Sequence, residues 1–210
     1  MAQNILLTPG ELYFLGKLMQ ARYIDYAYVA GMDDISQHRD LYEKETTASL
    51  VRKNILMEDF SGDVEIDPGC EDLLRPVFFG ETETSMDAVT ASTGSVTAVK
   101  FHYLDGKCVS VSVVPAGLLL NETDETAVRE MVSSLVPEDL PAFEPKTVDE
   151  LPREKIDRIY AFKKLHIGSS SERYYAVLSE GNFYTTNAEG DLASVSAVDF
   201  VKRAYETIRG

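Results

Sequence analysis

Apolar residues in the first eighty positions recur at the spacing of an α-helix. Leu12, Leu15, Leu18 and Met19 fall on one helical face. The stretch TPGE at positions 8–11 precedes them in the order of a capping box. It has a threonine cap, a proline at the first helical position and a glutamate three residues after the cap. The pattern predicts a helix that begins behind Thr8.

Two further helices are expected in this part of the chain. One covers Asp40 to Lys53 and ends at Asn54, a residue type that tolerates the backbone of a helix terminus. The other begins at Asp67-Pro68, which has the order of a cap followed by a proline, and it runs through Leu73-Leu74. The aromatic stretch from Tyr23 to Val29 fits a helix or a buried strand, and both interpretations stay open.

From Met86 the apolar period changes from helical to alternating. Three strands are expected, one with Val89 and Ala91 and the others at residues 96–104 and 108–114, with Thr93-Gly94 and Asp105-Gly106 in the turns between them. A helix follows behind Thr123 or Asp124. Its apolar stripe at i, i+3, i+4 and i+7 is Val128, Met131, Val132 and Leu135.

The same plan returns after residue 155. Strands are expected at 156–166, 173–178, 182–186 and 192–195, and Glu180-Gly181 takes the place of the earlier Asp105-Gly106 turn. Ser196 caps a last helix with the stripe Val201, Ala204, Tyr205 and Ile208. The two turns are 75 residues apart (105 to 180) and the two stripes 73 residues apart (128 to 201).

These patterns predict an α+β fold in which a helical N-terminal part precedes two related antiparallel-sheet-plus-helix halves with pseudo-two-fold symmetry. The N-terminal half is residues 1–136 and the C-terminal half is 156–210. The proline-rich, acidic connection 137–155 lies between them, and its four prolines exclude a continuous helix. Since a hairpin followed by a helix is a common local arrangement, two unrelated units remain the alternative.

The net charge of the chain limits the kinds of binding partner that are expected. The chain has 35 acidic and 20 basic residues and a net charge of −15. A field of this sign repels phosphate groups, so we expect neither a nucleic acid partner nor an anionic membrane. No stretch approaches the roughly 20 apolar residues that span a bilayer. With no basic leader before an apolar run and with only Cys70 and Cys108 as cysteines, a cytoplasmic location is expected.

The chemistry-bearing residues form no recognisable site. His38, His102 and His166 are far apart in the sequence, and the two cysteines form no Cys-x-x-Cys pair. No nucleophile elbow of the Gly-x-Ser-x-Gly kind and no glycine-rich phosphate loop is present. We therefore predict a protein that is not an enzyme, with no catalytic residues, no metal and no cofactor. An enzyme with an unrecognised site stays open as an alternative class.

Two apolar stretches are candidates for binding a partner. RPVFFGE places Phe78 beside Phe79, and PAGLLLNET places Leu118, Leu119 and Leu120 in an expected strand edge or loop. One interpretation is ordinary core, since apolar residues are mostly inside. The other is an exposed patch for a protein partner. On the second interpretation these five residues are the candidate partner-binding residues.

The stretches LLTPGELYFLGKLM and SLVRKNILMEDFSGDVEIDPGCEDLLRPVF resemble the ESX (type VII) secretion-associated chaperones of the EspG type. The shared features are a capped first helix with Glu11, a helix that runs into Ile55-Leu56, an acidic turn with Gly62, and a short helix ending in Leu73-Leu74. The resemblance covers residues 5 to 80. Beyond them it rests on the architecture of two related sheet-and-helix halves.

This resemblance implies a cytosolic, non-enzymatic chaperone that binds a helical secreted protein and keeps it competent for export. Because the motifs of the family are loose apolar patterns, the resemblance carries no binding residue over to this chain. The proline-rich connection has no counterpart in the pattern.

The same N-terminal stretch also resembles a winged-helix module, in which a helix ending in LVRKNIL precedes a β-wing at EDFSGDVEI. A DNA-binding version needs Lys and Arg concentrated on that helix. Arg52 and Lys53 are present, but Glu43 and Glu45 share the segment. A regulatory or protein-interaction module of this class therefore stays open, and a DNA-binding one is disfavoured.

Overall fold

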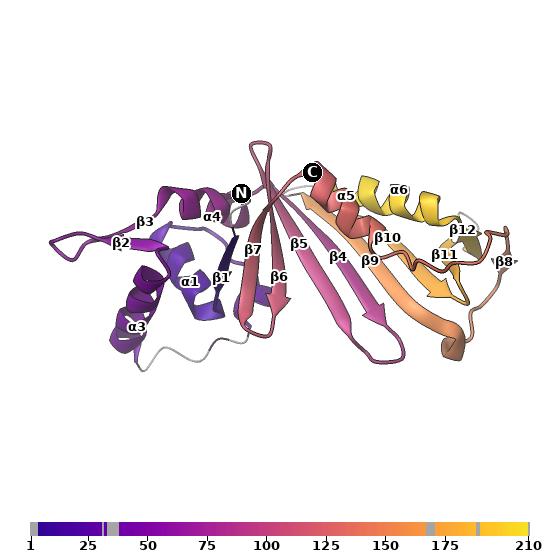
Figure 1. The fold of residues 1–210 in the computed structure, drawn as a ribbon, viewed down its shortest axis with the longest axis horizontal. Helices are drawn as coiled ribbons and strands as arrows, with labels where there is room; N and C mark the ends of the chain where they lie inside the picture. The colour runs from indigo at the N-terminus through magenta and orange to yellow at the C-terminus, as the bar shows by residue number, and fades with distance from the viewer. Residues whose placement is uncertain (1–3, 31, 33–37, 167–170, 188–189, 210) are drawn as a thin grey trace. The chain divides into compact units, whose positions relative to one another are not determined.

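The chain folds into helices and antiparallel strands in an α+β architecture, as predicted (Figure 1). The computed structural model describes residues 4–30, 32, 38–166, 171–187 and 190–209. Contacts divide the chain into two compact units. Unit 1 is Met1–Gly80 with His102–Glu122, and unit 2 is Glu81–Phe101 with Thr123–Gly210. Strand β5 (Val96–Leu104) contributes residues to both.

Unit 1 packs helices against a small antiparallel sheet. Its elements are β1 (Asn4–Leu7), α1 (Pro9–Leu18), α2 (Tyr26–Val29), α3 (Arg39–Arg52), β2 (Leu56–Glu58), β3 (Val64–Ile66), α4 (Pro68–Phe79), β6 (Lys107–Val114) and β7 (Gly117–Thr123). The strand order is β1-β7-β6, and β2 and β3 form a separate two-stranded sheet. The predicted helices are present, and the ambiguous aromatic stretch forms one helical turn, α2.

Local sequence signals start and stop these helices. The capping box of α1 is confirmed, because the Glu11 N–H donates to Thr8 Oγ1 at 3.1 Å and the Thr8 N–H donates to Glu11 Oε2 at 2.7 Å. Asn54 has φ +56°, the left-handed conformation expected of a residue that follows a helix. Helix α4 was predicted through Leu74 but continues past Pro76 to Phe79.

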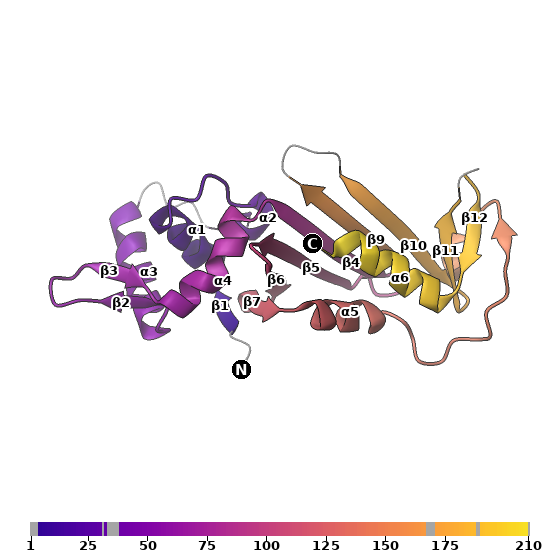
Figure 2. The same ribbon diagram turned by 90° about the horizontal axis from the view of Figure 1, so that it is seen from above.

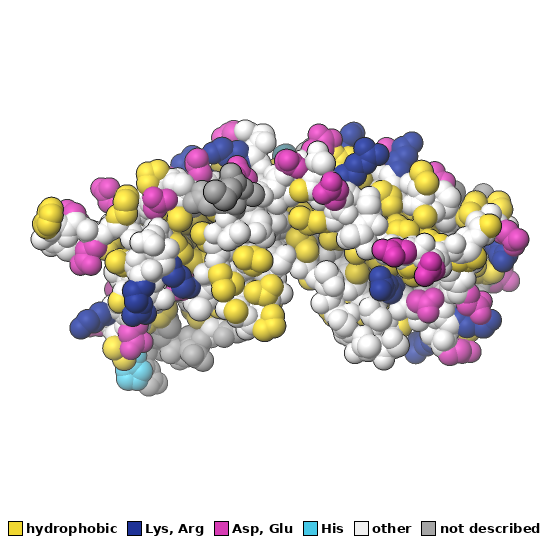
Figure 3. Space-filling model, in the orientation of Figure 1, with side chains coloured by type: hydrophobic (Ala, Val, Ile, Leu, Met, Phe, Trp, Pro, Cys, Tyr) yellow, Lys and Arg dark blue, Asp and Glu magenta, His cyan; other side chains and the backbone are white. Residues whose placement is uncertain are grey.

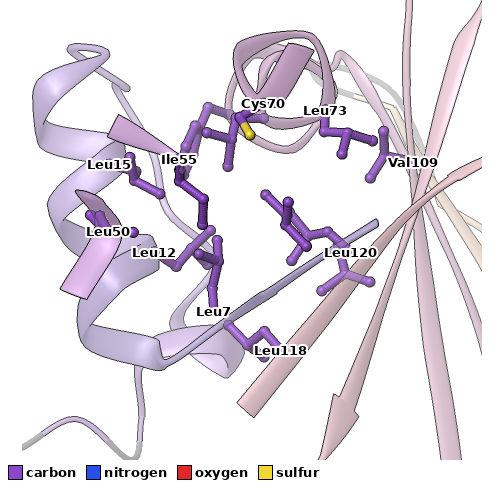
Figure 4. Packing of buried hydrophobic residues seen from close by; sticks show 14 of the residues in the cluster. Leu7, Leu12, Leu15, Leu50, Ile55, Cys70, Leu73, Val109, Leu118 and Leu120 are labelled. Carbon is purple, nitrogen blue, oxygen red and sulfur yellow. The ribbon is translucent and has the colours of Figure 1, made fainter. Parts of the chain in front are cut away.

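The hydrophobic core of unit 1 joins every helix to one face of the sheet (Figure 4). Leu12, Leu15 and Leu50 are fully buried on α1 and α3, and Leu7 and Leu120 are fully buried on β1 and β7. Each such side chain contributes about 1.5–3 kcal/mol by its removal from water. The sheet face and the helices therefore hold each other in place.

One buried carboxylate ties three elements of this core together. Glu11 has a relative exposure of 4%. Its Oε2 accepts from Lys53 Nζ at 2.6 Å, and its Oε1 accepts from Ser49 Oγ at 2.7 Å. Lys53 Nζ also donates to the Leu6 carbonyl of β1 at 3.0 Å. The start of α1, the end of α3 and the edge of β1 are thus joined through Glu11 and Lys53.

In unit 2, two helices lie on an antiparallel sheet. Its elements are β4 (Thr82–Thr90), α5 (Glu125–Ser133), β8 (Thr147–Val148), a 3₁₀ turn (Arg153–Lys155), β9 (Ile156–His166), β10 (Glu172–Ser179), β11 (Asn182–Thr186), β12 (Leu192–Val195) and α6 (Ala197–Ile208). The order is β4-β9-β10-β11-β12-β8. Helix α6 packs on β4, β9 and β10, and α5 packs beside α6 (Figure 2).

Aromatic rings fill the space under α6. The ring of Phe200 stacks on Phe183 with centroids 4.1 Å apart and lies 5.0 Å from Tyr160. Phe162 pairs with Tyr174 across β9 and β10, and their rings stack at 5.8 Å. The Tyr160 hydroxyl donates to the Leu135 carbonyl at 3.1 Å. Among buried side-chain polar atoms of the described residues, the Tyr174 hydroxyl has no hydrogen-bond partner.

The two predicted repeats share an element order and a turn conformation. Four strands and a helix occur twice, as β4-β5-β6-β7-α5 and as β9-β10-β11-β12-α6. Asp105-Gly106 has φ +50° and +77°, and Glu180-Gly181 has φ +48° and +77°, so both turns have positive φ at both central residues. The first copy was predicted with three strands, and β7 is the fourth.

The symmetry and the boundaries of the predicted halves stay predictions. The compact units interleave in sequence and do not follow the boundaries at 136 and 156. Superposition of 86–135 on 156–208 is the test of pseudo-two-fold symmetry. The connection 137–155 is irregular apart from β8 and the 3₁₀ turn, in accord with its prolines.

Replacing Glu11 tests the role of the buried carboxylate. Glu11→Gln keeps the volume but loses the charge opposite Lys53, so we expect a loss of about 1–3 kcal/mol in the free energy of unfolding. Glu43→Gln, in the exposed Arg39 pair at 2.8 Å, is the control, and we expect a change within about 0.5 kcal/mol. Urea unfolding measures both, and equal effects would contradict the assignment.

The same carboxylate predicts a pH dependence. Burial raises the pKa of Glu11, but the bonds from Lys53, Thr8 and Ser49 outweigh it and hold the pKa below the ordinary 4.5. A lowered pKa in the folded state adds stability above pH 4.5, and this stability is lost as pH falls through the folded pKa. We therefore expect wild-type stability to fall below pH 4.5 more steeply than that of Glu11→Gln in urea titrations.

Tyr160 is fully buried, and Tyr174 is half-buried with a buried hydroxyl, so the two tyrosines of unit 2 can be compared as a pair. Tyr160→Phe leaves the Leu135 carbonyl without its donor, and we expect it to cost about 1 kcal/mol. Burial raises the pKa of Tyr174 to about 12, and its hydroxyl lacks a partner. We expect Tyr174→Phe to be neutral or to stabilise by up to about 1 kcal/mol. Thermal unfolding of both variants measures these changes in stability. A larger loss of stability for Tyr174→Phe than for Tyr160→Phe would contradict this account.

Candidate protein-binding site

Three of the five residues predicted to bind a partner lie in the core. Leu118 is 2% exposed, Leu120 is fully buried and Phe78 is 7% exposed, and all three belong to the core cluster of unit 1. In Figure 4, Leu118 and Leu120 are labelled on β7 within this core. Since their side chains are not accessible, these three are corrected from contact residues to core residues.

The other two predicted residues remain accessible. Leu119 lies between two core residues of β7, so its side chain is on the opposite face of the strand, where it pairs with the exposed Leu6 of β1. Phe79, at the end of α4, is 36% exposed, and the Arg75 guanidinium lies 5.9 Å from its ring centroid. Their role in binding stays a prediction.

The most exposed apolar side chain among the described residues is one that the sequence prediction missed. Phe60 lies at the tip of the β2–β3 hairpin and has a relative exposure of 114%. The hairpin is anchored at its base, where Leu56 is 2% exposed and pairs with Ile66. It extends away from α3 and α4 (Figure 1). The tip therefore has no apolar neighbour of its own to cover it.

A network of hydrogen bonds defines the turn that presents Phe60. Asp59 Oδ1 accepts from the Ser61 N–H at 2.8 Å, from Ser61 Oγ at 2.7 Å and from the Asp63 N–H at 3.0 Å. The bonds from Ser61 and Asp63 lower the pKa of Asp59. Gly62 completes the turn with φ +88°. A turn that is ordered before binding loses less conformational entropy when a partner arrives.

Two of the three histidines, and both cysteines, have structural surroundings. His102 Nε2 and the Tyr28 hydroxyl share a hydrogen bond at 2.7 Å, and His166 Nδ1 bonds Thr82 Oγ1 at 2.8 Å. Cys70 and Cys108 are buried, and burial raises the pKa of Cys108 to about 11. Within the described ranges, no group of three or more His, Cys, Asp or Glu side chains could hold a metal ion. No helix of the described part is long and apolar enough to cross a membrane.

The helix–hairpin order expected of a winged-helix module is present as α3, β2 and β3. A wing that contacts nucleic acid needs positive charge to meet the phosphates. The hairpin has acidic residues at Glu58, Asp59, Asp63 and Glu65 and no Lys or Arg. Its charge therefore argues against a nucleic acid partner and leaves a protein partner open.

No protein-family model matches the chain, and no curated protein matches it. A solved structure does. The chain is similar to the Mycobacterium tuberculosis type VII secretion system chaperone EspG5, solved in complex with a PE25–PPE41 dimer. The TM-score is 0.66 at 10% sequence identity, over 98% of this chain and 95% of that chain. The chain has an EspG-like fold. The predicted resemblance is thereby confirmed at the level of the fold.

The free energy of unfolding distinguishes the core residue Leu120 from the surface residue Phe60. Leu120→Ala removes a fully buried side chain, and we expect a loss of about 2–5 kcal/mol in the free energy of unfolding. Phe60→Ser removes an exposed one, and we expect a change within about 0.5 kcal/mol. Urea unfolding of both variants is the measurement. A Phe60→Ser loss as large as that of Leu120→Ala would mean that Phe60 is packed and is not a surface contact.

Proposed function

We propose that this protein is a non-enzymatic chaperone that binds a helical protein substrate of a type VII-like secretion system. The observation that carries the proposal is the likeness of almost the whole chain to a secretion chaperone solved with its protein partner. The acidic surface and the absence of recognisable catalytic motifs are compatible with a binding protein. The resemblance of residues 5 to 80 to the EspG type supports the same function.

We place the β2–β3 hairpin at the centre of the binding surface. Burial of a Phe side chain that is fully exposed in the free protein contributes about 1.5–3 kcal/mol. Aromatic anchors of this kind carry a large share of the affinity in many interfaces. Met57 in the middle of β2, with a relative exposure of 47%, adds apolar surface on the same hairpin. The preorganised turn lowers the entropic cost of using it.

The geometry suits a helical partner. A narrow two-stranded hairpin with an aromatic tip can enter the groove between two packed helices, where alternating ridges leave apolar holes. Its base is fixed by Leu56, so the tip is held at a set distance from the hydrophobic core of unit 1. A chaperone built this way shields an apolar surface of its substrate without enclosing it.

Substitution of Phe60 tests the proposal. A tagged wild-type protein purified from its native host should carry one helical secreted protein at near-stoichiometric ratio. Phe60→Ser should lower the recovered partner at least tenfold, since a hot-spot residue contributes about 2 kcal/mol or more. Phe143→Ser is the matched control, because Phe143 is also exposed, at 45%, but lies on the connection in unit 2. Mass spectrometry quantifies the partner in each sample.

Two other results of this experiment would contradict parts of the proposal. Loss of the partner with Phe143→Ser but not with Phe60→Ser would move the binding surface away from the hairpin. Absence of any stoichiometric partner in the wild type, together with a rise in melting temperature on addition of a small molecule, would overturn the chaperone function itself.

A further inference from the structure

The segment that carries Phe60 contains acidic residues and no basic ones. Between Asn54 and Leu74 the sequence contains no Lys or Arg. The acidic residues of this segment are Glu58, Asp59, Asp63, Glu65, Asp67, Glu71 and Asp72. Figure 3 shows acidic side chains beside the hydrophobic ones at the free end of the β2–β3 hairpin. The apolar tip is therefore set in a negative field.

Most of these carboxylates already have a structural partner. Glu71 pairs with Arg75 at 3.5 Å, and Asp72 pairs with Lys107 at 2.9 Å. Asp67 caps α4 through the N–H groups of Gly69 and Cys70. These contacts account for the acids at the base of the segment and leave the hairpin itself.

Two carboxylates on the hairpin, Glu58 and Glu65, are not explained by contacts of this kind. Within the residues that the structure describes, neither Glu58 nor Glu65 forms an ion pair. Glu58 lies opposite Val64, and Glu65 lies opposite Met57. Since adjacent positions of a strand point to opposite faces, one carboxylate lies on each face of the hairpin. Exposed Phe60 is thus bordered by negative charge on both sides.

We propose that the partner surface that receives Phe60 is an apolar socket bordered by Lys and Arg side chains. This inference rests on the proposed function and names the chemistry of its substrate. Glu58 is the last residue of β2 and precedes Phe60 by two positions, a chain length of at most about 7 Å. That distance is shorter than the Debye length of about 10 Å at 0.1 M salt, so the Glu58 carboxylate acts on whatever surrounds the tip. Glu65 lies on the paired strand, one position further from the turn, and adds to the same negative field. An acidic border would be repelled, and a neutral one would leave two carboxylates partly desolvated without compensation.

The two kinds of residue then have separable kinetic roles. Opposite charges at the rim of an interface raise the association rate and make it salt-dependent. A desolvated aromatic anchor at the centre slows dissociation. Glu58 and Glu65 should therefore act on the association rate, and Phe60 on the dissociation rate.

A library of two-helix hairpins displayed on yeast, randomised at the connected end, supplies the probe. Clones that bind the wild-type protein but not Phe60→Ser are the tip-directed clones. We expect Lys and Arg to exceed Asp and Glu around their apolar positions, relative to the unselected library. At low salt their association with Glu58→Gln/Glu65→Gln should be roughly three- to tenfold slower, with dissociation nearly unchanged.

The control keeps the total charge the same. Glu150→Gln/Glu154→Gln also changes the net charge from −15 to −13 (−15 + 2), at exposed sites on the connection. This variant should slow association less than about twofold, because it removes no charge from the hairpin that carries Phe60. Equal slowing by both variants would mean that total charge is the cause and would overturn the inference.

Tip-directed clones with neutral or acidic borders, or the recovery of no tip-directed clone, would also overturn it. These outcomes differ from failure of the proposed function. A native partner that depends on Phe60 but has a neutral border leaves the chaperone function standing. Conversely, recovery of clones bordered by Lys and Arg, without any native partner, would support the inferred chemistry of the tip and contradict the chaperone function.

Discussion

The architecture of unit 1 depends on the neutralisation of one buried carboxylate. Glu11 lies where α1, α3 and β1 converge, and a carboxylate with 4% exposure is unfavourable there unless donors surround it. Lys53, Ser49 and the Thr8 N–H supply those donors. Because they come from the C-terminal end of α3 and the N-terminal cap of α1, the bonds can all form only when these elements are correctly placed. The requirement for compensation thus specifies the packing as well as stabilising it.

The position of the hairpin follows from the same contact. Lys53 is the C-terminal cap of α3, so its bond to Glu11 fixes where that helix ends. Asn54 reverses the chain in the left-handed conformation, and Ile55 and Leu56 then enter the core. The strands leave the core at Met57, which is half exposed. A binding tip at the far end of the hairpin is therefore oriented by a contact at the opposite end of the segment.

Signals that reside in a few adjacent residues predicted the fold well. The TPGE capping box, the two acidic-residue–glycine turns and the helical stripes each encode their structure locally. Strand β1 was missed and β7 was left open between a strand edge and a loop, because the assignment of each depends on the other. In three consecutive leucines, only the register with Leu7 opposite Leu118 decides that Leu119 faces outward. Pairing across more than a hundred residues is not visible in a local pattern.

The tip was missed for a related reason. Three-residue strands carry almost no periodic signal, so the EDFSGDVEI stretch was taken only as an acidic turn or as a possible wing. A signal was nevertheless present in the stretch. Phe60 is an aromatic residue with acidic residues on one side and a Ser-Gly-Asp turn on the other, which leaves it no apolar neighbour in sequence. An aromatic residue in that setting indicates a side chain that its own fold does not cover.

An exposed phenylalanine on a projecting hairpin also creates a hazard, because apolar tips and short strand edges associate with copies of themselves. The carboxylates beside Phe60 oppose this outcome, since two copies of the tip that approach each other bring like charges within a Debye length. The same field favours a partner with a positive border. One arrangement of charge therefore limits self-association and selects the substrate, which explains why the acidic residues on the hairpin are left without basic neighbours. An ion pair between these carboxylates and a Lys or Arg of the same chain would remove both the limit on self-association and the preference for a positive partner.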